Sequence, residues 1–477
     1  MLTPLEITQG FYISDSLPVS HQQCTNLRVN ILQVEGGSEK QLFGTDGIEQ
    51  VATSGVLKQI NRGARTKNGI PYFVNGTTLY RLDMTTAEDG TESFTLVALG
   101  TVAGLGFVSM ADNGVQLMIL SPGGSGYIYN ESVVPAFAEI TDSDFNASGA
   151  PQLCQYIDGY FAVTTDSKKW IVSSLNDGLS WNALDFSSAE SDPDNIVAPI
   201  VVNNQMYIVG SETTEGVQNI GGSGFPFQRN GVFLDKGCTA PFTLIRTNST
   251  FFMVGAGARE GSAIWKFAGN SFSKISTSSI DTIVQSYTLD ELYASLAWSY
   301  SSNGAYYVGF SFPDRTFVFD LVTELWHERK STLFEEQSRW RPNSVIAAYN
   351  KILVGDSIDG RIGVVNPDTL TEYDSDMIRV FTTQPFTNKG DEITSTILEL
   401  TMESGRADAE VENPTVGMSM SKDGVTFGAE RVRKVGKIGN YTKRIIFRKN
   451  GRFDRRVVLL FRISDPIRVS IIRLAYE

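Results

Sequence analysis

Few residues in this chain of 477 have the types and the spacing that chemistry at an active site requires. It has only two histidines, His21 and His327, and three cysteines, Cys24, Cys154 and Cys238. A protein metal site normally draws on clustered histidine and cysteine ligands, and no such cluster occurs here. The cysteines are far apart, odd in number and without CxxC spacing, so we expect buried free thiols in a protein made in a reducing compartment. The sequence therefore predicts no metal, no cofactor and no histidine-based catalysis.

Two pairs of carboxylates could in principle serve acid–base or calcium chemistry. Asp192 and Asp194 form one pair, and Asp374 and Asp376 form the other. Neither pair repeats with the spacing of a calcium-binding loop, and both lie in Pro- or Ser-rich connections. We therefore interpret them as solvated loop charges.

The segment Ser174–Trp181, with the sequence SLNDGLSW, gives the sharpest enzymatic signal. It resembles the Asp-box hairpin found in the blades of sialidases, although Asn176 stands where that box has Asp. The box is structural even in those enzymes, which also need an arginine cluster, a tyrosine and a glutamate, and which carry the box in several blades. We therefore expect Asn176, Asp177 and Trp181 to be packing residues. A sialidase-like or glycan-binding β-propeller that contacts the host surface is the alternative function.

The strongest electrostatic feature is a basic stretch near the C-terminus. The whole chain has a net charge of −13, whereas residues 431–477 carry +11 and the first 430 residues carry −24. The negative total disfavours general binding of nucleic acid. The basic residues alternate with apolar ones, as on the solvent face of a hairpin, so they could meet phosphate or, equally, an acidic partner surface such as a neighbouring copy. The candidate docking residues are Arg431, Arg433, Lys434, Lys437, Lys443, Arg444, Arg448, Lys449, Arg452, Arg455 and Arg456.

The elements that must position these residues are β-strands arranged in a repeat. A turn led by Asn or Gly opens a short aromatic and β-branched strand, a second turn follows, and a second strand ends in polar residues. Seven such hairpins begin near residues 68, 115, 158, 204, 249, 304 and 350. Their spacing of about 43 to 55 residues is that of a four-stranded propeller blade. We predict an all-β fold that contains a β-propeller of seven blades, with six as the alternative.

After Asp374 the repeat gives way to strands in which apolar and polar residues alternate, joined by Lys-Asp-Gly and Lys-Asn-Gly turns. This pattern predicts a C-terminal β-sandwich. We expect an N-terminal arm and closing strands over residues 1–40, the propeller over 41–373 and the sandwich over 374–477. One short helix is expected within Ser276–Ala294, with Thr288 as its N-cap. The N-terminus does not have the pattern of a signal peptide, and no apolar run reaches the length of a membrane span, so we predict no membrane anchor.

Six short motifs, in this order, resemble the tail-hub proteins of short-tailed bacteriophages, also called packaged-DNA stabilisation or head-completion proteins. The similarity runs from about residue 11 to 476 and brings no catalytic residue with it. The loop content of residues 210–230 is too generic to align. The motifs are Asp15–Val19 followed by Asn26–Asn30, then Phe43–Ile48, Lys236–Phe242, Ser279–Leu292 and Ser421–Gly428.

This resemblance implies a structural virion protein rather than an enzyme. Such proteins form a hexameric ring, or nozzle, beneath the portal and its adaptor, close the DNA-filled head and carry the tail needle and the tailspikes. We expect double-stranded DNA to pass through the lumen without specific binding, because an acidic wall repels the duplex and lets it slide. The expected location is the virion tail, after synthesis in the host bacterial cytoplasm.

Overall fold

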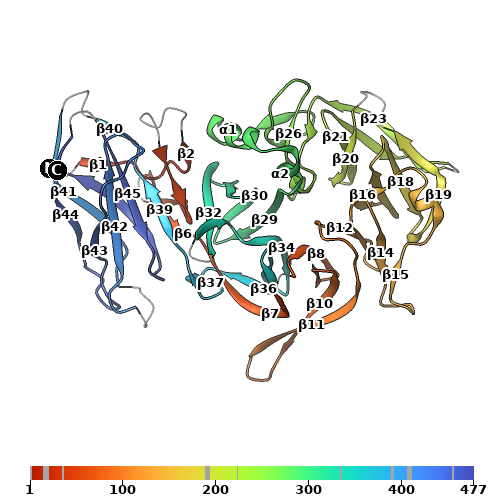
Figure 1. The fold of residues 1–477 in the computed structure, drawn as a ribbon, viewed down its shortest axis with the longest axis horizontal. Helices are drawn as coiled ribbons and strands as arrows, with labels where there is room; N and C mark the ends of the chain where they lie inside the picture. The colour runs from red at the N-terminus through yellow and green to blue at the C-terminus, as the bar shows by residue number, and fades with distance from the viewer. Residues whose placement is uncertain are drawn as a thin grey trace.

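The chain folds into a ring of β-sheets with a two-sheet unit at one side (Figure 1). The computed structural model describes residues 3–13, 21–34, 37–57, 59–188, 194–222, 224–333, 336–387, 392–405, 411–453 and 456–477. No helix in these ranges is both long enough and apolar enough to cross a membrane. The predicted class, a β-propeller followed by a C-terminal β-sandwich, is confirmed.

The described residues of the ring form seven antiparallel sheets, which settles the number of blades at seven. Blades 1 to 4 follow the order of the chain. Blade 1 contains β8 (Asn61–Lys67), β9 (Ile70–Asn75), β10 (Thr78–Thr86) and β11 (Glu92–Thr101), and blade 2 contains β12 (Ser109–Asp112), β13 (Leu117–Leu120), β14 (Gly126–Tyr129) and β15 (Phe137–Glu139). Blade 3 contains β16 (Pro151–Ile157), β17 (Tyr160–Thr165), β18 (Lys169–Ser174) and β19 (Asp177–Ser188), and blade 4 contains β20 (Ile196–Val202), β21 (Gln205–Gly210), β22 (Thr214–Asn219) and β23 (Phe227–Leu234).

Blades 5 to 7 complete the ring, and the last one takes its outer strand from the N-terminal part of the chain. Blade 5 contains β24 (Gly237–Cys238), β25 (Ile245–Arg246), β26 (Phe251–Ala256), β27 (Ala263–Phe267) and β28 (Phe272–Lys274). Blade 6 contains β29 (Leu296–Ser302), β30 (Ala305–Ser311), β31 (Thr316–Asp320) and β32 (Leu325–Leu333), and β33 (Glu336–Arg339) pairs with β32. Blade 7 contains β34 (Pro342–Ala348), β35 (Lys351–Asp356), β36 (Asp359–Asn366) and β7 (Gly47–Leu57).

The seven predicted hairpins are the central strand pairs of the seven blades. The turn that leads into the first hairpin, between β8 and β9, shows how local sequence sets these strands: Asn68 and Gly69 both have positive φ, at 52° and 79°, as a tight two-residue turn requires. Neighbouring blades then bury each other's apolar faces, as where Tyr72 and Val74 of blade 1 share a core with Leu117 of blade 2. A single blade could not cover both of its faces, so the ring is the stable form.

The ring is closed by β7, which pairs antiparallel with β36 so that Ile48 lies opposite Val365. Ile48 is fully buried, and its carbonyl accepts a hydrogen bond from the Tyr373 N–H at 2.8 Å. Tyr373 follows β37 (Thr371–Glu372), which pairs parallel with β7 and antiparallel with β38 (Ser375–Asp376). Segments from both ends of the propeller sequence therefore hold the closing blade.

Two short helices, rather than the one predicted, lie between blades 5 and 6: α1 (Ser278–Ser286) and α2 (Leu289–Tyr293). Thr288 caps α2 as expected, in a capping box with Glu291. Tyr287 has extended backbone angles, which separates the two helices.

The sandwich at the left of Figure 1 contains strands from both ends of the chain. One sheet has the order β44 (Ile445–Phe453), β41 (Ile393–Met402), β46 (Ser470–Tyr476), β6 (Gly37–Gly44) and β5 (Leu27–Val34), with β1 (Thr3–Leu5) also on β46. The other has the order β4 (Cys24–Thr25), β39 (Arg379–Thr382), β45 (Arg456–Ile463), β42 (Thr415–Ser421) and β43 (Arg431–Lys434), with β40 (Phe386–Thr387) on β45. A separate pair, β2 (Tyr12–Ile13) and β3 (His21–Gln22), lies between β1 and β4 in the sequence.

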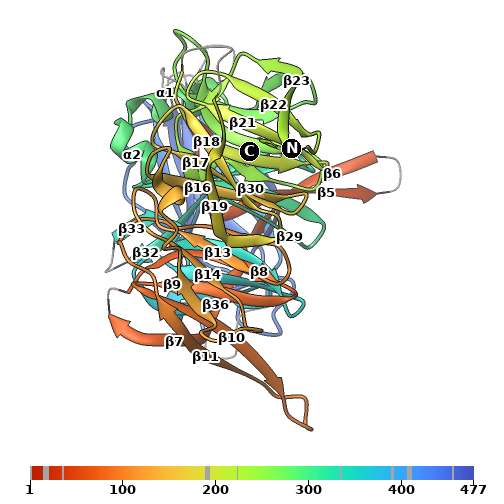
Figure 2. The same ribbon diagram turned by 90° about the vertical axis from the view of Figure 1, so that its right-hand side faces the viewer.

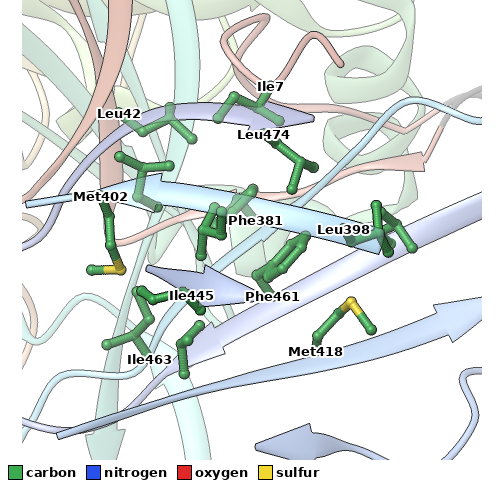
Figure 3. Packing of buried hydrophobic residues seen from close by; sticks show 14 of the residues in the cluster. Ile7, Leu42, Phe381, Leu398, Met402, Met418, Ile445, Phe461, Ile463 and Leu474 are labelled. Carbon is green, nitrogen blue, oxygen red and sulfur yellow. The ribbon is translucent and has the colours of Figure 1, made fainter. Parts of the chain in front are cut away.

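N-terminal residues are part of the core of this sandwich. Figure 3 shows Ile7 and Leu42 packed with Leu474, beside Phe381 and Phe461, whose rings stack at 4.8 Å. Strands β1, β5 and β6, which begin within residues 1–40, thus belong to a sandwich sheet, and the strand that closes the ring begins at Gly47. The domain boundaries at residues 40 and 373 stay predictions.

Candidate docking surface on the sandwich

The basic residues singled out in the sequence gather at the end of the sandwich farthest from the propeller. They lie on β43, on β44 and on the connection between these strands, and both strands are edges of their sheets (Figure 1). Arg456, at the start of β45, lies in the interior of a sheet instead, and Arg455 lies outside the described residues. We call the remaining nine candidate residues, Arg431 to Arg452, the basic edge.

Strand β44 alternates between core and solvent. Ile445, Phe447 and Phe453 point into the sandwich core, whereas Arg448 and Arg452 are exposed. The register of β41 and β44 shifts between the pairs at Ser395 and Ile397, which adds a residue to β44. This irregularity puts Arg448 and Lys449 side by side on the outside, the latter with φ of 58°.

Two arginines of the basic edge hold the two edge strands together. Arg431 donates to Asn450 Oδ1 at 2.8 Å and to the Arg448 carbonyl. Arg433 donates to the Ile446 carbonyl at 3.1 Å, and its guanidinium lies 5.3 Å from the centre of the Phe447 ring. These two side chains therefore satisfy backbone groups of β44 that no neighbouring strand pairs, and they have less freedom to meet a partner.

Three further members of the basic edge already have partners. Arg444 binds Glu399 through both carboxylate oxygens, at 2.8 and 2.7 Å, and this contact lowers the pKa of Glu399. Arg452 pairs with Glu392, and Lys434 donates to Asn413 at 3.0 Å. The charges of Arg444 and Arg452 are thus partly neutralised within the sandwich, and Lys434 is held by a neutral amide.

Four residues of the basic edge remain available to bind a partner. Within the described ranges, their side chains have no hydrogen bond and no ion pair with another residue. Three exposed apolar side chains, Val432, Ile438 and Tyr441, accompany them on the same connection and strand. The four are Lys437, Lys443, Arg448 and Lys449. Exposed cations next to exposed apolar groups are suited to an acidic protein surface.

The histidines and cysteines occupy structural positions. His327 lies on the outer strand of blade 6, as predicted, is 3% exposed, and stands edge-on to Tyr307 at 5.7 Å. Burial, together with the charges of nearby arginines, lowers its pKa well below the usual value. The three cysteines are free and buried, as expected, and burial raises the pKa of each thiol to about 12.

The residues that resemble an Asp box contact their own chain. Asp177 Oδ1 accepts from Gln116 Nε2 at 3.2 Å, and Trp181 Nε1 donates to the Gly178 carbonyl at 2.9 Å. Asn176 occupies the turn between β18 and β19 with φ of 58°. The contact of Asp177 with Gln116 joins blade 3 to blade 2, and the contact of Trp181 with Gly178 stabilises β19 itself, which fits the packing role we inferred.

The carboxylate pairs do not form a described site. Asp194 Oδ2 accepts from the N–H groups of Glu212 and Thr213, both at 2.9 Å, and Asp192 lies outside the described residues. Asp374 and Asp376 are exposed in the turn of β37 and β38. In the described ranges, no three His, Cys, Asp or Glu side chains come together so that they could hold a metal ion.

Sequence reasoning missed an acidic feature on the outer hairpin of blade 1. The β10–β11 hairpin projects beyond the body of the molecule in both views (Figures 1 and 2), and its exposed tip carries Glu88 and Asp89. An N–H of Thr91 donates to Asp89 at 2.9 Å and shapes the turn. The acidic run Ala-Glu-Asp-Gly between two long polar strands was the available signal.

The sheets and the basic edge define a class: a seven-bladed β-propeller with a β-sandwich that presents a basic surface. Two family models match almost the whole chain, the bacteriophage P22 Gp10 beta-propeller over residues 3–370 and the bacteriophage P22 Gp10 beta-sandwich over residues 378–477. The chain belongs to the bacteriophage P22 Gp10 family. The resemblance to phage tail-hub proteins is thereby confirmed.

One curated relative agrees with this family, and comparison with solved structures finds other β-propellers at low similarity. The tail hub protein gp10 of Salmonella phage P22 is 22% identical over 390 residues, which cover 78% of this chain and 80% of that protein. Among solved structures, the WD40 β-propeller domain of Doa1 has a TM-score of 0.40 at 11% identity and covers 68% of this chain and 98% of that one. The N-terminal domain of Nup159 has a TM-score of 0.38 at 10% identity, covering 68% and 95%.

Proposed function

We propose that this chain is a structural subunit of a phage tail hub, located in the virion tail, that closes the DNA-filled head. The observation that carries the proposal is membership of one family along both the propeller and the sandwich, together with a relative that is a tail hub protein. A hub acts through shape and surface, which agrees with the finding that the histidines, the cysteines and the Asp-box residues make structural contacts within the chain. Its partners are then the portal and adaptor proteins, the tail needle and the tailspikes.

The DNA exit channel runs between copies in a hexameric ring and not through one propeller. The axial cavity of the propeller has a volume of about 470 Å³ and is lined by side chains from all seven blades, including Arg65, Tyr156 and Trp298. That is the size of a small-molecule pocket, far below what a duplex needs. The negative total charge of the chain keeps such a channel wall from holding DNA.

We propose that the basic edge docks on the acidic tip of the β10–β11 hairpin of a neighbouring copy. The basic edge lies at the left end of the molecule and the hairpin projects from its lower edge (Figure 1), so the two features are separate surfaces, as a head-to-tail contact in a ring requires. Glu88 and Asp89 are exposed, as are Arg448 and Lys449, so opposite charges meet without first breaking an internal pair. Salt should weaken this contact, because the Debye length is about 8 Å at physiological ionic strength.

A charge-reversal experiment tests the docking contact. Arg448→Glu with Lys449→Glu should prevent the purified chain from forming rings on the portal and adaptor, as seen by electron microscopy. Adding Glu88→Lys with Asp89→Lys to the same chain should restore them, because both signs are then exchanged. Arg259→Glu with Lys266→Glu, in blade 5, is the control with the same change in charge.

Two outcomes distinguish a failure of the docking proposal from a failure of the hub proposal. Rings that form normally in the first double variant refute the basic edge as the docking surface but leave the hub proposal standing. A wild-type chain that never associates with the portal and adaptor, at any salt concentration, refutes the hub proposal itself.

A further inference from the structure

A cavity that opens to solvent lies where the sandwich meets blades 6 and 7, and its lining is basic. Its volume is about 240 Å³, and it is walled by strands β5 and β6, the turn before β30, the segment after β36, β39 and the segment before β46. Three arginines from three different elements, Arg28, Arg379 and Arg468, line it, against a single carboxylate, Asp46. The docking surface at the far end of the sandwich shares no residue with this cavity.

Arg28 is the unusual member of this lining. It is 7% exposed, and within the described ranges its side chain has no hydrogen bond and no ion pair. The ring of Phe43 lies 5.6 Å from its guanidinium carbon. A buried guanidinium without an acceptor is costly, so such a group normally faces an anion.

Arg379 is in a similar position. It is 1% exposed; its two Nη atoms donate to the carbonyls of Met377 and Leu370 at 3.4 and 3.2 Å, and its Nε has no partner. Burial lowers its pKa to about 10, so it still carries its charge at neutral pH. Gly44 lies against it, since a Cβ there would stand 3.1 Å from Arg379 Nε.

The other polar groups of the lining add donors. The Thr45 hydroxyl is buried without a partner among the described residues, and Asn30 and Asn303 also line the cavity. Asp46 is held by the Tyr300 hydroxyl at 3.3 Å and does not pair with Arg28. Arg468 has only a long contact, 3.8 Å, with the exposed Asp368. The cavity therefore offers several donors and more positive than negative charge.

We propose that this cavity is a binding site for a small tetrahedral oxyanion, phosphate or sulfate, held between Arg28, Arg379 and Arg468. Donors arrive from different sides of the cavity, which suits an anion with oxygens in several directions better than a flat carboxylate. Because those donors come from both the sandwich and the connection that leaves blade 7, the bound anion ties these parts together. The site is independent of the hub proposal.

The test is to measure binding to the full chain by titration calorimetry with sodium phosphate and sodium sulfate, and to record melting temperatures against sodium chloride and sodium acetate of equal ionic strength. Phosphate and sulfate should give saturable binding and a rise in the melting temperature that chloride and acetate do not give. Arg28→Gln and Arg468→Gln should each weaken phosphate binding at least tenfold. Arg448→Gln, an exposed arginine outside the cavity, should leave it unchanged.

Arg468 is half-exposed, so its variant keeps the test valid even if Arg28→Gln does not fold. The proposal is overturned if phosphate gives no heat of binding, or if chloride at equal ionic strength stabilises the chain as much. It is also overturned if Arg468→Gln binds phosphate as tightly as the wild type. Stabilisation by acetate alone overturns the tetrahedral anion in favour of a carboxylate.

Discussion

At the scale of single residues, the junction of blades 6 and 7 holds positive charge in an apolar setting. The Arg329 guanidinium, 1% exposed, is surrounded by the rings of Trp298, Tyr300, Tyr307 and Trp340, at 4.9 to 5.5 Å. Aromatic faces stabilise a cation where hydrogen-bond acceptors are scarce. The same charge acts on His327, which precedes it by two positions on β32 and which Arg28 also approaches.

His327 should make the stability of the protein depend on pH. Its folded-state pKa is well below 6.5, so the unfolded chain binds a proton there that the folded chain does not. Stability is therefore complete above about pH 7 and falls as the pH drops below about 6.5, by at most about 1.4 kcal/mol per pH unit. Urea unfolding at several pH values between 7.5 and 5.5 measures this slope.

The slope, rather than the stability at one pH, identifies the group. His327→Gln should reduce the slope even if the variant is less stable throughout, because loss of packing acts equally at every pH. His21→Gln is the control, since that histidine is only half-buried and its pKa is lowered less strongly. An unchanged slope in His327→Gln contradicts the assignment.

At the scale of elements, blade 6 shows how a glycine makes room for a large ring. Gly309 on β30 lies opposite Trp298 on β29, and a Cβ on Gly309 would stand 2.1 Å from Trp298 Cζ2. Trp298 cannot move aside, because it is buried against Trp340 at 4.5 Å. Gly309→Ala should therefore lower the free energy of unfolding by about 3 kcal/mol.

Chemical denaturation of Gly309→Ala, compared with the wild type, checks this value. Gly106→Ala is the matched control, since nothing lies within 4 Å of a Cβ there and its backbone is not left-handed. That variant should stay within about 0.5 kcal/mol of the wild type. A Gly309→Ala protein as stable as the control would mean that the ring of Trp298 can rearrange.

The elements also show which parts of the fold the sequence could predict. The hairpins of the blades were predictable because their turns and alternation are local, as at Asn68 and Gly69. The pairing of Ile471 on β46 with Leu42 on β6 was not, because no local pattern selects a partner more than 400 residues away. The hydrogen bond from Arg433 to the Ile446 carbonyl of β44 was not predictable either. It depends on how the edge strands β43 and β44 lie relative to each other, which no local pattern shows.

At the scale of the whole molecule, propeller and sandwich share one continuous sheet. Strand β32 of blade 6 pairs with β4, which pairs with β39, which pairs with β45 of the sandwich. The short strand β4, Cys24–Thr25, is the only link between the two parts along this path of the described sheet. Any fragment that keeps the N-terminal strands but lacks the C-terminal ones leaves half of a sandwich behind.

This arrangement predicts opposite behaviour for two fragments that both lack the sandwich strands after Met377. Residues 45–377 keep all seven blades, including β7, and the Tyr373 contact that holds it. They should melt cooperatively as a monomer. Residues 1–377 add β5 and β6, whose fully buried Leu27 and Leu42 share a core with many residues of the removed strands.

The longer fragment should therefore bind a hydrophobic dye such as ANS and aggregate at concentrations where the shorter one stays soluble, because its added strands expose both a free edge and an apolar face. Circular dichroism, melting curves and light scattering on both fragments give the comparison. If residues 45–377 are unfolded, the propeller depends on the sandwich for its stability. If residues 1–377 behave as well as the shorter fragment, the N-terminal strands do not need the C-terminal sheet, and the shared core is not what holds them.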